Sequence, residues 1–178
     1  AGSGGLSVAA GAAQLGRKVV LIEKGAMGGD CLNTGCVPSK ALIAAASRAH
    51  AMRNAAKYGV ANIEPDINSA AVMDHVHSAI AAIEPNDSQD RFEELGVTVL
   101  REHAAFTGPR ELQAGGVTVK AKHFVIATGS TPFIPPIDGL KETPFFTNET
   151  IFNNRAHLDH LIVIGGGPIG VELAQAHR

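Results

Sequence analysis

The residues best suited to chemistry in this sequence are its two cysteines, Cys31 and Cys36, which lie five positions apart. Five residues of regular helix rise about 7.5 Å, beyond the roughly 7 Å over which a disulfide joins two Cα atoms. A bond between them therefore requires a bend in the backbone, which Gly35 permits. Pro38 suits the first turn of a helix, because its missing N–H would be unpaired there. Cys36 is thus expected at a helix N-terminus, where the dipole favours a thiolate, and the pair is suited to redox cycling.

Two cysteines close together also have other interpretations. They could form a structural disulfide or remain two buried thiols, and their spacing alone does not separate these roles from redox chemistry. A zinc site is disfavoured because it needs four ligands, and no second Cys/His pair has matching spacing. His75 and His77 are two apart and do not share a helix face, so we expect surface or interhelical histidines and no metal site.

Composition excludes several classes of protein. The chain has 178 residues, of which 45% are hydrophobic, enough for a sizeable core. The net charge is −2 with acids and bases mixed, so no basic block points to nucleic acid. There is neither a run of eighteen apolar residues nor a signal-peptide pattern. Two cysteines do not make a secreted disulfide scaffold, so a reducing cytoplasm is expected.

Part of a glycine-rich nucleotide-binding motif opens the chain. Gly2 and Gly5 match the second and third glycines of G-x-G-x-x-G, and a helix of small residues closed by Gly16 is expected to follow. Residues 18–23 then read as a buried strand that ends in an acid. Glu23 lies near the spacing at which a carboxylate holds a ribose hydroxyl. The segment predicts a dinucleotide site; the alternative is a tight strand–helix turn with a surface glutamate.

A complete G-x-G-x-x-G stands near the end of the sequence. It follows an apolar segment at 161–164, expected as a buried strand, and opens a helix. In such a turn Gly165 makes the tight bend, Gly167 admits a pyrophosphate, and Gly170 lets helix and strand touch. This segment predicts a second dinucleotide site.

The region between the two motifs is expected to contain both helices and strands. The sequence predicts a helix at 38–58 closed by Gly59, and then a helical region at 68–95 with a kink or restart at 85–87. An antiparallel meander at 97–119 and an apolar strand at 123–127 are expected next. An extended linker containing Pro132, Pro135 and Pro136 follows.

Three motifs in this order, GGDCLNTGCVPSK, VIATGSTPFIPP and LIVIGGGPIGVE, resemble the flavoprotein disulfide reductases, the family of dihydrolipoamide dehydrogenase, glutathione reductase and mercuric reductase. The resemblance implies an α/β fold: a three-layer, Rossmann-like FAD-binding domain with a parallel sheet, helices and a β-meander over residues 1–157. The first strand, turn and helix of an NAD(P)-binding domain would then occupy residues 158–178.

The resemblance also implies a reaction. Hydride would pass from NAD(P)H through FAD to a Cys31–Cys36 disulfide and then to a disulfide substrate, as in dihydrolipoamide dehydrogenase. Alternatives are a mercuric reductase-like enzyme and a flavin-binding module with a structural disulfide. Cys31 resembles the interchange thiol, Cys36 the flavin-facing thiol, and Lys40 with Glu172 the ion pair beside the flavin. Cofactor contacts carried over from the family are Gly2, Ser3, Gly5, Glu23, Lys24, Gly29, Asp30, Ala127, Thr128 and Gly129 for FAD, and Gly165, Gly167 and Gly170 for the nicotinamide nucleotide.

Two positions depart from the family pattern. Asp30 stands where a threonine is common, and Thr34 replaces a frequent valine. We expect the chain to be an N-terminal fragment of a cytoplasmic homodimer, inactive by itself, with the family's catalytic base and the residue that selects NAD or NADP beyond Arg178. No nucleic acid or membrane partner is expected, and the substrate stays open between a disulfide and a metal ion.

Overall fold

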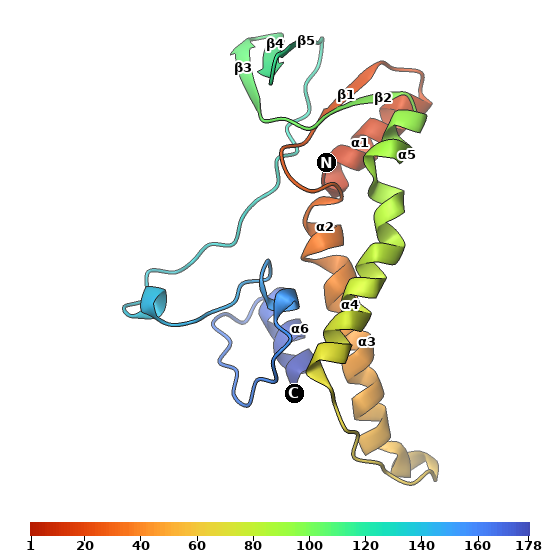
Figure 1. Ribbon diagram of the computed structural model, residues 1–178, viewed down its shortest axis with the longest axis vertical. Helices are drawn as coiled ribbons and strands as arrows, with labels where there is room; N and C mark the ends of the chain where they lie inside the picture. The colour runs from red at the N-terminus through yellow and green to blue at the C-terminus, as the bar shows by residue number, and fades with distance from the viewer. The chain divides into compact units, whose positions relative to one another are not determined.

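The computed structural model describes all of residues 1–178 (Figure 1). The chain forms two compact units, each assembled from two separate stretches: unit 1 comprises residues 1–33 and 83–131, and unit 2 comprises residues 34–82 and 132–178. The expected domain boundary after residue 157 stays a prediction.

Unit 1 contains a parallel two-stranded sheet. Strands β1 (Val19–Ile22) and β2 (Val97–Leu100) pair in parallel, and helices α1 (Ser3–Gln14) and α5 (Gln89–Glu94) pack beside them (Figure 1). The buried core of this unit consists of Ala1, Leu6, Ala9, Leu21, Phe92, Val97 and Val99. The α/β class with a parallel sheet is therefore confirmed.

The assignment of residues 97–100 to the antiparallel meander is wrong. This segment pairs with β1, with Val19 opposite Val97 and Ile22 opposite Leu100. Its buried Val97 and Val99 belong to the core under α1 and α5. The meander itself is confirmed in a shorter form, as β3 (Ala104–Gly108), β4 (Glu111–Ala114) and β5 (Val117–Lys120), which pair in antiparallel order.

Helix α1 begins and ends at glycines. Gly2 is its N-cap, with extended backbone. At the other end Gly16 has a φ of 69°, its N–H donates to Ala13 O, and the next N–H, of Arg17, donates to Ala12 O. These two bonds form a Schellman motif, which satisfies carbonyls that the helix end would leave unpaired. The predicted end of this helix at Gly16 is confirmed.

Unit 2 is helical, and Figure 1 shows α6 beside α3. Its helices are α3 (Cys36–Arg53), η1 (Ala55–Tyr58), most of α4 (Ser69–Ile83), η3 (Leu140–Glu142), η4 (Ile151–Asn153) and α6 (Pro168–His177). The core consists of Ala41, Leu42, Met73, Val76, Ile151 and Phe152. Arg155 also donates to both carboxylate oxygens of Asp74 on α4, at 2.7 and 2.9 Å.

The predicted ends of the central helices agree closely with the structure. η1 is closed by Gly59, which has a left-handed backbone. The predicted interruption near Pro85 is the short helix η2 (Glu84–Asp87), after which Ser88 caps α5 by accepting a hydrogen bond from Arg91 N–H. His75 and His77 are exposed on α4, as expected of surface histidines.

Two predicted strands are absent. Residues 123–127 and 161–164 belong to no helix and to no sheet. The Ile126 and Ile162 side chains are 75% and 76% exposed. Both segments have the apolar composition of buried strands. However, no neighbouring strand of this chain pairs with either, and a lone extended segment has no ladder of hydrogen bonds.

Candidate nucleotide and redox site

The start of α1 lies against the start of α2 (Gly29–Asn33), within unit 1. A Cβ atom on Gly29, whose φ is +57°, would lie 2.4 Å from the Gly2 Cα atom. The neighbouring Gly28 N–H donates to Ala1 O at 2.9 Å. Only glycine fits at position 29, and the close approach brings two of the predicted FAD contacts, Gly2 and Gly29, together. The first N–H groups of a helix are unpaired and favour an anion such as a phosphate.

Ala127 lies against the first turn of α1, beside Gly5. A Cβ atom on Gly5 would lie 3.7 Å from Ala127 Cβ and 3.8 Å from Leu21 Cδ1. The apolar segment before Thr128 and Gly129 therefore ends against the first turn of α1. Three other predicted contacts, Ser3, Lys24 and Asp30, are exposed, and so are Thr128 and Gly129.

Glu23 follows β1 and is held by its neighbours in the backbone. Its carboxylate lies against the backbone nitrogen of Ala1 and accepts a hydrogen bond, at 2.6 Å, from Gly25 N–H. The side chain is therefore an acceptor held in place beside the α1 turn.

The cysteines belong to two different helices. Cys31 lies in α2 and is half-buried, whereas Cys36 is the first residue of α3 and is exposed. Gly35 between them has φ −128° and ψ −108°, outside helical geometry. The predicted bend at Gly35 and the predicted place of Cys36 at a helix N-terminus are confirmed.

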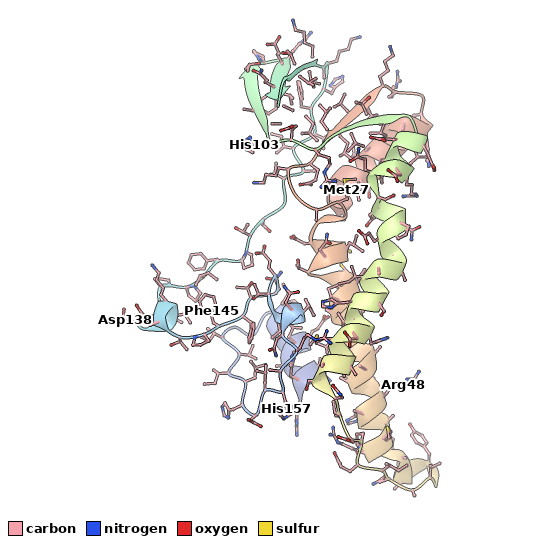
Figure 2. The ribbon with its side chains drawn as sticks, viewed as in Figure 1. Met27, Arg48, His103, Asp138, Phe145 and His157 are labelled. Atoms are coloured by element: carbon pink, nitrogen blue, oxygen red, sulfur yellow. The ribbon has the colours of Figure 1, made fainter.

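Asn33 fastens the loop that carries Cys31, and sequence reasoning missed it. Its side-chain amide donates to Met27 O at 2.9 Å and to Gly29 O at 2.8 Å. Figure 2 labels Met27 in the segment between β1 and α2. The two bonds fix the backbone that leads into and through the close approach at Gly29. A side chain with two donors in a glycine-rich loop is the signal that could have found it.

Thr34 carries a polar atom without a partner. Its Oγ1 is buried and makes no hydrogen bond within the chain. Leaving such a group unpaired costs about 1–3 kcal/mol. The hydroxyl lies two residues before Cys36, in the same unit.

Lys40 and Glu172 meet within unit 2. Lys40 Nζ lies 2.7 Å from Glu172 Oε2, which confirms the short separation expected of two residues far apart in the sequence. α3 and α6 are packed together beside this pair by Leu173 and Ala176. The side chains are 62% and 41% exposed, so in this chain the pair is a surface salt bridge.

The second glycine turn has its own close approach. Gly165 has a φ of +115°, and a Cβ atom on Gly170 would lie 2.4 Å from Gly165 O and 3.3 Å from Val163 Cγ1. Gly167, the N-cap of α6, has no atom within 4 Å of the place where a Cβ would stand. The turn therefore leaves open space at the start of a helix, as a phosphate group requires.

No cluster of three or more His, Cys, Asp or Glu side chains among residues 1–178 could hold a metal ion. None of the helices is both long enough and apolar enough to cross a membrane.

Comparison with known proteins identifies the class. The family model described as pyridine nucleotide-disulphide oxidoreductase matches residues 1–178, and the chain belongs to this family. Its relatives include a mercuric reductase from Streptomyces lividans, 37% identical over 98% of this chain and 38% of that protein. A dihydrolipoyl dehydrogenase from Thermus scotoductus is 35% identical over 99% of this chain and 38% of that protein.

Solved structures support the same fold. The HOCl-induced flavoprotein disulfide reductase RclA from Escherichia coli has a TM-score of 0.81 and 24% identity, covering 99% of this chain and 38% of that chain. A Cu(II) complex of that protein gives the same TM-score. The chain spans 38% of the length of the two relatives named above.

Proposed function

We propose that the protein to which this chain belongs is an FAD-dependent pyridine nucleotide–disulfide oxidoreductase, in which Cys31 and Cys36 form the redox-active pair. The observation that carries the proposal is the place of Cys36 at the first residue of α3, directly after the glycine loop of a chain that belongs to this family. A helix N-terminus stabilises a thiolate, the form in which cysteine reacts.

The residues around the α1 turn fit FAD. Gly2 and Gly29, which approach each other at the start of α1, carry no side chains, and a pyrophosphate there would be held by N–H groups. Glu23 would accept hydrogen bonds from a ribose, since its carboxylate is already held beside the turn. When bound, FAD would supply two-electron transfer between a nicotinamide nucleotide and the cysteine pair. Ser3, Lys24, Asp30, Thr128 and Gly129 remain proposed contacts.

Lys40 is proposed to place a positive charge near the flavin. It lies one helical turn after Cys36 on α3, and Glu172 fixes its position by the ion pair at 2.7 Å. The Gly165–Gly170 turn is the proposed nicotinamide-nucleotide contact, because its open Gly167 starts α6. We further propose NAD(P)H as the reductant, a homodimer as the assembly and the cytoplasm as the compartment.

The cysteine roles can be tested by titrating the complete, FAD-loaded protein with NADPH or NADH under anaerobic conditions. Cys31→Ser should keep a long-wavelength band from a thiolate against the flavin, and Cys36→Ser should lose it. Identical spectra for the two variants would contradict the separate roles proposed for Cys31 and Cys36. A merely structural disulfide would give only bleaching of the flavin in the unmodified protein.

The substrate is proposed to be a disulfide, with mercuric ion as the second candidate. The mercuric candidate is favoured by a specific observation, the 37% and 38% identity to mercuric reductases from Streptomyces lividans and Shewanella putrefaciens. Rates of NAD(P)H consumption with lipoamide, with oxidised glutathione and with thiol-complexed Hg(II) would separate them. The same Cys36→Ser variant is the control, because it should abolish consumption with every true substrate.

A further inference from the structure

Cys31 lies in a helix that is too short to be stable by itself. α2 comprises only Gly29–Asn33, and the hydrogen bond from Leu32 N–H to Gly28 O is 3.5 Å long, whereas the usual length is about 2.9 Å. Forming a single helical turn costs more backbone freedom than its few hydrogen bonds return. The position of Cys31 therefore depends on contacts that α2 makes outside its own backbone ladder.

The side chain of Asn33, two residues after Cys31, supplies such contacts. Its amide donates to Gly29 O at 2.8 Å and to Met27 O at 2.9 Å, so it ties the end of α2 to its start and to the segment before it. Packing does not replace these bonds, because a cavity of about 310 Å³ lies beside Met27 and Asn33. Leu32, between Cys31 and Asn33, is buried and is the other anchor.

The proposed reaction with a disulfide has two steps that differ in their demand on Cys31. First, one thiolate of the reduced pair attacks a sulfur of the substrate, a mixed disulfide forms, and one substrate thiolate leaves. The other cysteine then attacks the cysteine sulfur of the mixed disulfide, so that the Cys31–Cys36 bond forms and the second substrate thiolate leaves. The two protons of the dithiol end on the two released thiols, and the pair has given up two electrons.

We infer that Asn33 is a positioning residue that holds Cys31 for the second, ring-closing step; this rests on the proposed function. The first step joins two separate molecules and tolerates movement of α2. The second joins two sulfurs of one chain, and a misplacement of about 1 Å can slow such an oriented step about 100-fold. Loss of the two Asn33 hydrogen bonds should therefore slow ring closure and spare the first attack.

The test compares Asn33→Leu with Asn54→Leu in the complete, FAD-loaded protein. Asn54 is a matched control, because its amide also donates to a carbonyl four residues back, His50 O at 2.9 Å, but at the end of α3 far from Cys36. Each protein is reduced with dithiothreitol, freed of it without air, and mixed in a stopped-flow instrument with dithiobis(nitrobenzoate). This disulfide probe releases one coloured thiolate in each of the two steps.

Asn33→Leu should slow the second release at least about ten-fold and leave the first within about three-fold, whereas Asn54→Leu should change neither. The ratio of the two rates separates positioning from stability, since a variant that is only less stable keeps that ratio. If Asn33→Leu does not fold, Asn33→Ala compared with Asn54→Ala answers the same question.

An unchanged ratio in the Asn33 variant would overturn the inference and leave the proposed function standing. A different result would remove both: if mass spectrometry finds no Cys31–Cys36 disulfide in the unmodified protein after the reaction, the proposed function fails and the inference fails with it.

Discussion

The two glycine turns of this chain share a sequence pattern but differ in what surrounds them. The first, at the start of α1, is enclosed by other parts of unit 1: Gly29 approaches Gly2, and Ala127 and Leu21 approach Gly5. The second, before α6, makes its close approach within itself, between Gly170 and Gly165 O, and the segment before it is exposed. The motif therefore fixes the local bend in both places, whereas the enclosure depends on residues distant in sequence.

The largest effect is expected from Gly29→Ala. Its methyl group would stand 2.4 Å from Gly2 Cα, and residue 29 has a φ of +57°, so backbone strain adds to the clash. We expect a loss of about 2–5 kcal/mol in the free energy of unfolding, measured by urea denaturation. Gly25→Ala is the matched control, because a Cβ there would only touch Glu23 Oε1 at 3.4 Å. Equal stability of the two variants would show that the first turn is not enclosed as described.

Gly170→Ala should have the next largest effect. Its methyl would meet Gly165 O at 2.4 Å, but the exposed turn can shift, so we expect a loss of about 1–3 kcal/mol. Gly167→Ala is the control, since no atom lies within 4 Å of its added Cβ. It should leave stability unchanged and still weaken nicotinamide-nucleotide binding, which calorimetry would measure. The reverse pattern, with Gly167→Ala destabilising and Gly170→Ala neutral, would contradict the geometry of this turn.

Glu23 sharpens the comparison, because the second turn has no corresponding fixed carboxylate in this chain. Glu23→Ala should weaken FAD retention about ten-fold, as loss of a hydrogen bond to a charged group predicts. Retention is measured by dialysis and flavin absorbance. Unchanged retention would show that Glu23 does not contribute to FAD binding.

The smallest effect on stability is expected from Lys40→Ala. The ion pair with Glu172 is exposed, so its loss should cost less than about 1 kcal/mol. We expect flavin reduction by the nicotinamide nucleotide to slow far more than FAD binding weakens, which stopped-flow absorbance and flavin retention measure separately. Lys57→Ala, also an exposed lysine of unit 2, is the control. Equal rates of flavin reduction in Lys40→Ala and Lys57→Ala would show that Lys40 has no role beside the flavin.

Local signals in the sequence predicted the helices well. Pro38 and Gly59 bracket the α3–η1 region, and Pro85 marks the break between α4 and α5, because these residues act on the backbone of their own segment. The contact between Lys40 and Glu172 was also predicted, from the motifs that carry them. Its exposure was not, because burial of a side chain depends on what covers it.

Pairing between strands that are distant in sequence was the part that the sequence did not predict. Residues 97–100 look like a member of the meander because they stand next to it, yet their partner is β1. Residues 161–164 have the composition of a buried strand, but a strand is a property of a pair, and no partner is present. Asn33 escaped notice for a similar reason, because its importance lies in the two hydrogen bonds that its side chain makes.

The β1–β2 pairing also has a consequence for how the chain is made. Val19 and its partner Val97 are separated by a stretch that contains α3 and most of α4, and these belong to the other unit. At about 5–20 residues per second, synthesis from the first strand to the second takes roughly 4–15 s. During that time the strand that pairs with β1 in this structure is not yet made. The long separation in sequence between the paired strands therefore predicts that this sheet forms slowly.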